Sequence, residues 1–539
     1  MEIKEISVPL LGGAAGDYLK GREEITSFFD YQLQENVFQK RAEDLQGRTY
    51  PRRELVSHLL RYNERFGAGS KTINNIHALE KSDTVAVIGG QQAGVLTGPL
   101  YTIHKIVSII QLAKEQEKKL GVRVVPVFWI AGEDHDMDEI NHVHVMSNGR
   151  VKKSILPQMT EKKASASQTP LHHELSFAWV ESIFKTFRET KHTKQLLQLV
   201  KECLRRAETY TDFFAYIITE LFKEEGLILV DSGSSELRKW EAPFFCDLLE
   251  QHKGIQEALQ KQQKALQSRG YTPLITTKSE AVHLFLDIEG ERWLIEKKGN
   301  VFSCKDGEMS FTLEELLLIA KETPERLSNN VVTRPLMQEY LFPTLAFIAG
   351  PGEVAYWAEL QQVFHEIGFI MPPVIPRLMI SYVEGHIAAD LQDMSVSIED
   401  AFAKRIEKIK EAWLFEQTTE PIEDIFMQAR NEMEQTHAAL RALAERMNPG
   451  LTAFAMKNKH KIEEQLQVLE RAIQRDIEMK HAVSLNKFRR MESALQPMGS
   501  LQERVWNVFY YMNEYGFSFI HDLVGLPFAW DNTHKIVKI

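Results

Sequence analysis

The chain has 539 residues, which corresponds to roughly three to four domains at about 150 residues each. Hydrophobic residues make up 44% and charged residues 26%, a composition that excludes a disordered or low-complexity chain. The net charge of −11 argues against nucleic acid as the main ligand, because nucleic-acid binders usually carry a strongly basic domain. No apolar run approaches the roughly 18 residues of a membrane-spanning helix, so we expect no membrane partner.

The cysteines and the N-terminus indicate the compartment. The three cysteines, Cys203, Cys246 and Cys304, form no CxxC motif, so a cysteine zinc site is not expected. A sparse, odd count of cysteines is typical of a reducing environment. The N-terminal residues lack the basic and apolar regions of a signal peptide. We therefore predict a cytoplasmic protein.

The first part of the chain changes from helical to alternating patterns. Residues 1 to about 80 are rich in helix formers and predict a helical lead-in. Thr84–Ile88 is a short β-branched run that ends in glycine, and Val122–Ala131 is a second apolar run. Both are typical of strands that are buried on both faces of a parallel sheet. The residues between them, after Pro99, show the apolar stripe of a helix.

The same alternation returns further along the chain. A helix around Asp212–Glu224 leads into a strand at Leu227–Asp231. Another strand, Thr344–Ala349, is followed by a helix at Glu353–Ile367 and a strand at Ile370–Pro376. Five strands that alternate with helices predict an open α/β fold with a parallel sheet and right-handed crossovers. Ligands of such sheets bind at the carboxyl ends of the strands, near the point where the strand order reverses.

Two insertions and a helical appendage interrupt this pattern. Residues from about 150 to 225 are polar and then helical, whereas about 271–325 alternate with period two and predict an antiparallel meander. We therefore predict a core over 1–384, a helical coiled-coil hairpin over 385–500, and an aromatic tail over 501–539 that packs back on the core.

The hairpin prediction rests on apolar residues at spacings of three and four on both sides of Asn448-Pro449-Gly450. Such a pattern indicates two helices joined by a turn and packed along an apolar seam. It leaves two interpretations open, a hairpin within one chain or a hairpin that also pairs with a second copy, and we predict a homodimer through this region. The predicted seam comprises Ile425, Ala429, Met433, Thr436, Leu440, Leu443, Met447, Ile462, Leu466, Leu469, Ile473 and Ile477.

The loop after the first strand reads GGQQAGVLTGP. Small residues such as Gly90 and Gly98 let a ligand approach the backbone, and the N-terminus of the next helix suits a carboxylate or phosphate. Gln91 and Gln92 offer amide groups to a polar substrate at the end of the strand. The loop is neither GxGxxG nor a Walker A motif, so a tight strand–helix turn remains an alternative.

The next helix begins with further polar residues. Tyr101, His104 and Lys105 lie in its first turns, where spacings of three and four place side chains on one face. We predict that His104 and Lys105 are catalytic and stabilise negative charge in a transition state. The alternative is that His104 caps local backbone and Lys105 is solvated.

The second strand runs into GEDHDMDEINH, the densest group of ionisable residues in the chain. Glu133, Asp134 and His135 follow the end of that strand, where we predict direct contact with substrate amines and hydroxyls. A divalent metal or a structural network is the alternative, and we predict no metal.

Two further groups of residues are candidates for binding. Arg334 can hold a carboxylate or phosphate through its guanidinium fork, and Glu353 opens the helix that follows a buried strand. Near the C-terminus, Arg490, Trp506 and Tyr510 could hold a nucleotide by phosphate pairing and stacking. A solvated helix end is the alternative for this last group.

Four motifs together make the sequence resemble a known family. They are GGQQAGVLTGPLYTIHK, FWIAGEDHDMDEI, RPLMQEYLFPTLAFIAGPGEVAYWAEL and HDLVGLPF, in this order. With essentially the whole chain, they resemble the bacillithiol biosynthesis cysteine-adding enzyme family. The resemblance implies a Rossmann-like core with connecting-peptide insertions, similar to class I aminoacyl-tRNA synthetases, and a coiled-coil appendage.

The resemblance also implies an activity. It predicts a ligase that adds L-cysteine to glucosaminyl-malate in the last step of bacillithiol synthesis, with ATP or ADP as the expected nucleotide. Two alternatives remain. The absence of a KMSKS loop favours a non-catalytic scaffold that binds nucleotide or thiol and assists another ligase, and the GEDHDMDE cluster is compatible with a metal-dependent amidase.

Overall fold

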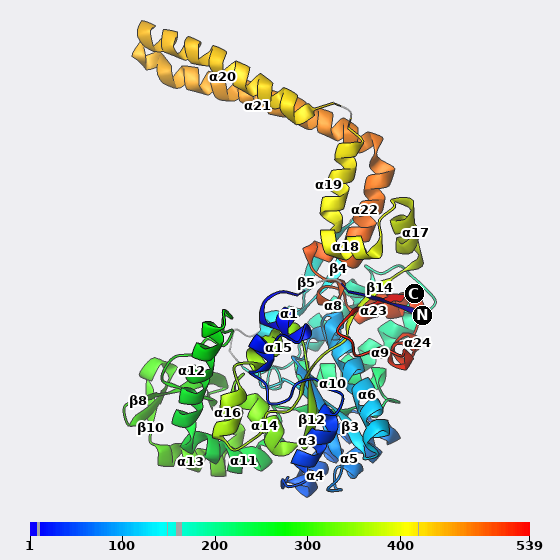
Figure 1. The fold of residues 1–539 in the computed structure, drawn as a ribbon, viewed down its shortest axis with the longest axis vertical. Coiled ribbons are helices and arrows are strands. Elements are labelled where there is room, and N and C mark those ends of the chain that lie inside the picture. The colour runs from blue at the N-terminus through cyan, green and yellow to red at the C-terminus, as the bar shows by residue number, and fades with distance from the viewer. Residues whose placement is uncertain (8–10, 148, 158–163, 419) are drawn as a thin grey trace. The chain divides into compact units, whose positions relative to one another are not determined.

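The computed structural model describes residues 1–7, 11–147, 149–157, 164–418 and 420–539. They form two compact units, one of Met1–Tyr382 with Ser500–Ile539 and the other of Val383–Gly499 (Figure 1). The second unit spans nearly the range predicted for the hairpin, and the C-terminal tail belongs to the first unit. Part of the insertion predicted at about 150–225, residues 158–163, lies outside the described residues.

A five-stranded parallel sheet forms the centre of the first unit. Its strand order is β13-β12-β2-β3-β6, so the chain places later strands on both sides of β2. All five predicted parallel strands are present, and the α/β, Rossmann-like prediction is confirmed. The order reverses between β2 and β12, the place where open α/β sheets bind ligands. The strands are β2 (Val85–Gln91), β3 (Val124–Ile130), β6 (Ile228–Asp231), β12 (Thr344–Ala349) and β13 (Val374–Pro376).

The alternation of side chains along β2 separates two hydrophobic cores. Val85 and Val87 face a core that contains the apolar stripe of α6 (Leu100–Leu120), whereas Ala86 and Ile88 face a core with α4 (Arg52–Arg65) and α11 (Ser235–Glu250). Both faces of the sheet are therefore covered by helices, which explains why β3 is buried at every position.

The N-terminal region is helical as predicted, except at its start. Strand β1 (Glu2–Ile6) pairs antiparallel with β15 (His534–Lys538), which lies beside β14 (Met379–Val383). The sequence prediction missed this sheet because its strands are short and their partners lie hundreds of residues apart. The lead-in helices are α1 (Gly13–Leu19), α2 (Glu23–Thr26), α3 (Val37–Leu45), α4 and α5 (Ser70–Ala78).

The second insertion contains the predicted meander. Its strands are β7 (Ala281–Ile288), β8 (Glu291–Lys298), β9 (Val301–Cys304) and β10 (Met309–Phe311). A fifth strand that the sequence did not predict, β11 (Leu327–Asn329), joins the sheet by pairing with β7. This pairing brings the chain back toward the central sheet just before α14 (Thr333–Leu341).

The first insertion begins with an unpredicted hairpin, β4 (His142–Ser147) and β5 (Arg150–Ile155), and continues with α8 (His173–Phe184), α9 (Thr193–Arg206) and α10 (Tyr210–Leu221). The single helix predicted at Glu353–Ile367 is wrong, because a turn at 358–360 divides it into α15 (Pro351–Trp357) and α16 (Gln361–Glu366). The remaining helices of this unit are α7 (Met137–Ile140), α12 (His252–Ser268), α13 (Leu313–Glu322), α23 (Val508–Tyr515) and α24 (Ser518–Gly525).

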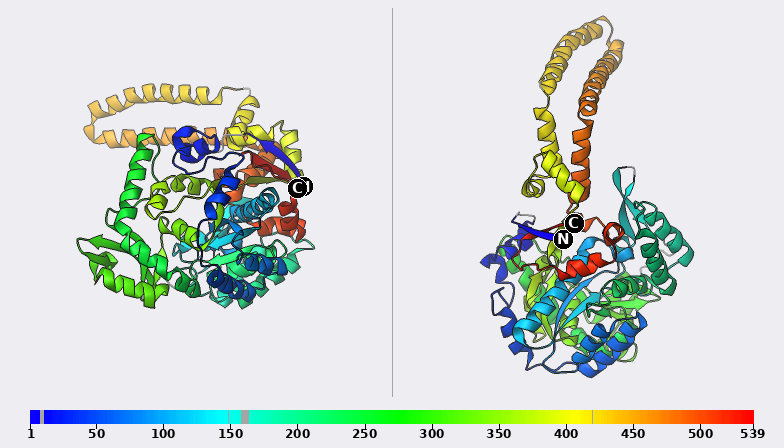
Figure 2. Two further views of the ribbon diagram at one scale, coloured as in Figure 1. Left: turned by 60° about the horizontal axis from the view of Figure 1, so that its bottom comes forward. Right: turned by 90° about the vertical axis from the view of Figure 1, so that its right-hand side faces the viewer.

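The second unit is helical. Figure 2 shows its two longest helices, α20 (Ile422–Met447) and α21 (Thr452–Lys480), which pack side by side and join at the predicted turn. The Asn448 side chain accepts the N–H of Gly450 at 2.9 Å in that turn. The other helices are α17 (Gly385–Asp393), α18 (Ile398–Lys404), α19 (Ile406–Glu416) and α22 (Ala482–Leu495).

The predicted apolar seam of the hairpin is wrong in part. Polar pairs join the two helices, among them Arg430 with Glu470, and Glu434 with Lys459 at 2.6 Å. Several predicted seam residues are instead exposed, because the apolar positions of each helix occupy a wider arc than one partner helix covers. The exposed ones are Ile425, Leu440, Leu443, Met447, Ile462 and Leu469. In the described parts of the chain, no helix is long and apolar enough to cross a membrane.

The glycines of the two strand-end loops yield a stability prediction. A Cβ atom on Gly90 would lie 2.8 Å from the carbonyl oxygen of Trp129, whereas a Cβ on Gly352 would meet nothing within 4 Å. We expect Gly90→Ala to lower the free energy of unfolding by about 1–3 kcal/mol, because neighbouring strands must move apart. Gly352→Ala should leave it unchanged or slightly raised. Urea denaturation of both variants measures the difference, and equal stabilities would contradict the close packing at Gly90.

Candidate active site

A cavity of about 1010 Å³ lies at the carboxyl ends of β2, β3 and β12, where the strand order reverses. Its walls come from the loops after these strands, from α14 and from the meander. Most of the residues predicted from separate motifs therefore line one space. They are Gly90, Gln91, Gln92, Tyr101, Lys105, Asp134, His135, Arg334 and Glu353.

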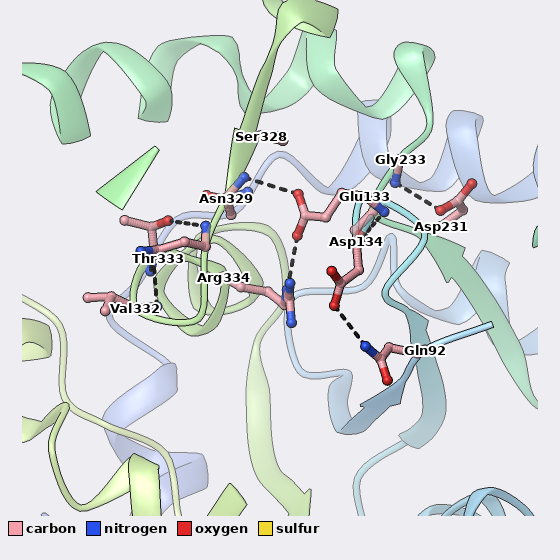
Figure 3. A network of polar contacts seen from close by, with 12 residues as sticks. Gln92, Glu133, Asp134, Asp231, Gly233, Ser328, Asn329, Val332, Thr333 and Arg334 are labelled. Atoms are coloured by element: carbon pink, nitrogen blue, oxygen red, sulfur yellow. Dashed lines mark hydrogen bonds and ion pairs between the residues drawn. The ribbon is translucent and has the colours of Figure 1, made fainter. Parts of the chain in front are cut away.

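Asp134 supplies negative charge to the cavity. Its Oδ2 accepts a hydrogen bond from Gln92 Nε2 at 2.9 Å (Figure 3). Its Oδ1 accepts a hydrogen bond from the backbone N–H of His135 at 2.8 Å. Burial raises the pKa of this carboxyl, but the charge of Arg334 and the hydrogen bond from Gln92 lower it further, so the net shift is downward. Asp134 is therefore an ionised acceptor suited to substrate amines or hydroxyls.

His135 is positioned by its neighbour Arg292. The guanidinium of Arg292 lies 3.1 Å from His135 Nδ1, and arginine can only donate, so Nδ1 accepts this hydrogen bond. Burial lowers the pKa of Arg292 to about 10. His135 thus lines the cavity with its Nδ1 engaged by Arg292.

Glu133 does not line the cavity, which corrects the prediction that it binds substrate directly. Its Oε1 accepts a hydrogen bond from Arg334 Nε at 2.9 Å, and its Oε2 accepts one from the backbone N–H of Asn329 at 3.0 Å (Figure 3). Oε2 also accepts a hydrogen bond from Arg238 at 2.7 Å. Burial raises the pKa of Glu133, but Arg238 and Arg334 outweigh it and the pKa is lowered. This buried carboxylate positions the side chain of Arg334, which does reach the cavity.

Lys105 lies at the cavity wall with its three N–H groups in use. Its ammonium donates to the carbonyl of Gly90 at 2.6 Å, to Gln91 Oε1 at 3.1 Å, and to the carboxylate of Glu353. Burial lowers the pKa of Lys105, and the charge of Glu353 opposes that shift. Glu353 also accepts the N–H of Gly350 at 2.6 Å, so one ion pair joins the loops after β2 and β12.

His104 is fully buried and does not line the cavity, in contrast to the predicted catalytic contact. Its Nδ1 lies 3.0 Å from Glu503 and its Nε2 lies 2.9 Å from the hydroxyl of Tyr382. Glu503 also binds the guanidinium of Arg377 at 2.5 and 2.7 Å. Burial lowers the pKa of His104 although Glu503 opposes the shift, so the ring is neutral. His104 reaches the cavity only through Glu503 and Arg377, which lines it.

Gly98 also lies outside the cavity lining, because the C-terminal tail holds its loop. The amide of Asn507 donates to the carbonyls of Leu96 and Gly98 at 2.6 and 2.8 Å. The N–H of Leu100, the first residue of α6, donates to the carbonyl of Trp506 at 2.8 Å. The C-terminal tail therefore binds the first turn of α6, where the sequence analysis predicted that a ligand carboxylate or phosphate binds.

The three residues of the predicted nucleotide site are divided between the two units. Arg490 belongs to the second unit, where its guanidinium binds Asp390 at 2.6 and 2.7 Å. Trp506 and Tyr510 belong to the first unit and stack on each other with ring centroids 5.7 Å apart. Trp506 is packed in the hydrophobic core, where burial of its large aromatic ring stabilises the fold.

Several cavity residues were missed in the sequence. Arg377 directly follows β13, and a basic residue at the end of a predicted strand was a usable signal. Arg292 and Asn329 come from the meander and from β11, so only tertiary structure places them here. Across the described residues, no group of three or more His, Cys, Asp and Glu side chains is placed to hold a metal ion.

Comparison with known proteins now gives the family. A sequence model of the bacillithiol biosynthesis BshC N-terminal Rossmann-like domain matches residues 1–378. The model of the BshC C-terminal coiled-coil domain matches residues 380–539. The chain belongs to the BshC family. The resemblance inferred from the four motifs is thereby confirmed.

Relatives in this family match along their whole length. Proteins named "Putative cysteine ligase BshC" from Bacillus cereus (strain AH187) and from Bacillus anthracis are each 53% identical over 539 residues, which is 100% of both chains. A solved structure titled as a putative arginyl tRNA synthetase from Campylobacter jejuni is 14% identical and covers 88% of this chain and 97% of its own. Its TM-score is 0.26, too low to bear on the fold.

A buried histidine beside the cavity of this BshC chain yields a pH prediction. His283 Nδ1 accepts from Asn330 Nδ2 at 3.1 Å, and its Nε2 donates to Gln256 at 2.5 Å. Burial lowers the pKa of His283 to about 4. The unfolded chain takes up this proton near pH 6.5 but the folded chain only near pH 4, so stability falls as the pH drops through that window. We expect a loss of roughly 3 kcal/mol from this group.

The variant His283→Asn tests this prediction. Asparagine tolerates the positive φ of 66° at this position and does not titrate. Its free energy of unfolding, measured with urea at pH 7 and pH 4.5, should change less between the two values than that of the parent. His77→Asn, at an exposed histidine of α5, is the control and should keep the parental pH dependence. An unchanged slope in the first variant would show that His283 titrates normally.

Proposed function

We propose that the chain is a ligase that joins L-cysteine to glucosaminyl-malate through an amide bond, as the last step of bacillithiol synthesis. The observation that carries the proposal is that polar residues from separate motifs line one cavity at the reversal of the strand order. The cavity, at about 1010 Å³, has room for two small polar molecules. The printed name of the relatives, "Putative cysteine ligase BshC", supports a ligase that uses cysteine.

Amide formation from a free carboxylate and an amine is uphill in water, so the carboxylate must be activated. We propose ATP as the activator. An oxygen of the cysteine carboxylate would attack phosphorus, and diphosphate or ADP would leave. The sugar amine would then attack the acyl carbon and expel AMP or phosphate, with loss of one proton from nitrogen. The chain would contribute mainly by orientation and electrostatic stabilisation.

The contacts in the cavity support distinct roles for its residues. Asp134 is an ionised acceptor for the amine or hydroxyls of the sugar, and His135 lines the same cavity. Arg334 is a cation for carboxylate or phosphate oxygens. Lys105 fixes Gln91 and Glu353 and keeps a cation at the cavity wall. His104 is a positioning residue for Arg377 through Glu503.

We also propose that the enzyme works in the cytoplasm. Its three cysteines are all free, and Cys203 and Cys304 are buried. Burial raises the pKa of Cys203 to about 12 and of Cys304 to about 11, so neither is a nucleophile near neutral pH. An enzyme whose substrate carries a free thiol and whose own cysteines are free suits a reducing compartment.

Product analysis tests the ligase directly. Pure protein with cysteine, glucosaminyl-malate and ATP should give the joined thiol by mass spectrometry, together with AMP for an adenylate or ADP for an acyl-phosphate.

Lys105→Met should lower kcat/KM by about 100-fold, because a buried cation next to the reacting groups is lost. Lys114→Met, on the exposed side of the same helix, should keep the parental rate.

Two results would contradict these assignments. Bound substrates without product under any nucleotide would favour the scaffold interpretation over the ligase. A normal rate in Lys105→Met/Glu353→Gln, a double change that removes the ion pair without leaving either charge alone, would exclude Lys105 as a contributor to catalysis.

We further propose that the chain forms a homodimer through the hairpin of the second unit. The apolar side chains of Leu443 on α20 and Leu469 on α21 are 48% and 54% exposed, and Leu440 and Met447, close to Leu443 in the sequence, are exposed as well. Exposed apolar surface of this kind is typical of a protein interface.

Sedimentation equilibrium should give a dimer for the parent and a monomer for Leu443→Glu/Leu469→Glu. Lys461→Glu is an exposed control on α21 that should remain dimeric, and a monomeric parent would refute the proposal.

A further inference from the structure

Asn329 is a polar side chain without a partner in the cavity wall. The residue is 0% exposed, and neither Oδ1 nor Nδ2 has a hydrogen-bond partner among the described residues. Burial of an unpaired amide is unfavourable, so native proteins rarely keep one without a use for it. Asn329 is also among the residues that line the cavity of the proposed active site, so a molecule bound there lies next to this unpaired amide.

The backbone of Asn329 is held firmly, so the unpaired amide is not the result of a loose loop. Its N–H donates to Glu133 at 3.0 Å, and its carbonyl accepts Arg292 at 3.0 Å. It also pairs with Leu284 in the β11–β7 ladder. The next residue, Asn330, shows the contrast: its side chain bonds His283 and the N–H groups of Val332 and Thr333.

Arg334 reaches the cavity from the other side of the same carboxylate. Its Nε donates to Glu133 Oε1, while the backbone N–H of Asn329 donates to Oε2 of the same carboxylate (Figure 3). Its two terminal nitrogens have no hydrogen bond to any described residue, and the side chain is 22% exposed. The buried carboxylate of Glu133 thus holds the backbone of Asn329 and the guanidinium of Arg334. The side chains of both residues have N–H groups without a hydrogen bond in the described structure.

The local charge favours an anion. Three arginines, Arg238, Arg292 and Arg334, face two ionised carboxylates, Glu133 and Asp134. A third carboxyl, that of Glu241, pairs with Arg238, but burial raises its pKa to about 7 and weakens its charge. The residues that line the cavity give the charge balance directly: six cations, Lys105, Lys278, Arg292, Arg334, Arg377 and Arg504, against three carboxylates, Asp134, Glu139 and Glu353.

We infer that Asn329 and Arg334 form a subsite for a carboxylate group of a substrate. The guanidinium fork would hold both oxygens, Nδ2 of Asn329 would donate a further hydrogen bond, and Oδ1 would accept from a hydroxyl or ammonium next to the carboxylate. The inference rests on the proposed function, whose two substrates both carry such a group: the malyl carboxylates of one, and the α-carboxylate of cysteine.

Calorimetric titration of the full-length protein separates these two sources. The ligands are glucosaminyl-malate, the methyl glycoside of glucosamine, L-cysteine and L-cysteine methyl ester. Asn329→Ala and Arg334→Lys should each weaken binding of one carboxylate-bearing ligand by about tenfold. Binding of the matching ligand that lacks the carboxylate should stay the same. The affected pair identifies the malyl group or cysteine as the occupant.

Thermal unfolding without ligand distinguishes a binding role from a structural one. Asn329→Ala removes an amide that bonds nothing in the described residues, so its Tm should equal or exceed that of the parent. Asn330→Ala is the matched control and should lower Tm, because it removes three hydrogen bonds. A Tm loss in Asn329→Ala like that of the control, with unchanged affinities, would overturn the inference.

The ligase and the subsite can fail separately. If the parent makes no product but Asn329→Ala still weakens a carboxylate ligand, the subsite stands and the ligase proposal fails. If the parent makes product and the KM for both substrates is unchanged in Asn329→Ala and Arg334→Lys, the ligase stands and the subsite is refuted.

Discussion

The arrangement of the cavity depends on one buried carboxylate, that of Glu133. It is 1% exposed and accepts hydrogen bonds from Arg238 on α11, Arg334 on α14 and the backbone of Asn329 on β11. A buried charge is tolerated only when its partners satisfy it fully, so loss of any one of them is costly. The requirement to satisfy Glu133 therefore fixes the meander and α14 against the loop after β3.

A second buried carboxylate, Glu503, acts in the same way on another cavity residue, Arg377. It binds Arg377 after β13 and His104 on α6, and its neighbour Asn507 holds the loop before α6. Burial raises the pKa of Glu503, but Arg377 and His104 lower it well below its usual range. The C-terminal tail is therefore part of the site's framework, which explains why motifs at both ends of the chain identify one family.

Patterns that are local in sequence were predictable, and long-range pairings were not. The five parallel strands appear as apolar runs that end in glycine or a polar residue, so the sheet and the cavity edge follow from the sequence alone. The sequence also placed Gln92, Asp134 and Arg334 at that edge. It could not distinguish Glu133, which turns inward to arginines, from Asp134, which faces the cavity, because adjacent residues differ only in the direction of their side chains.

The same limit explains His104 and Lys105, which stand next to each other in the helix. Successive helical residues point about 100° apart, so one faces the tail and the other the strand ends. Asn329 carried no signal at all, since its importance lies in bonds that it does not make within the described structure. A site that leaves buried donors unused gives up stability in the free protein and recovers it when a ligand supplies the acceptor. The balance of satisfied carboxylates and one unsatisfied amide is thus what a binding site, rather than a structural core, requires.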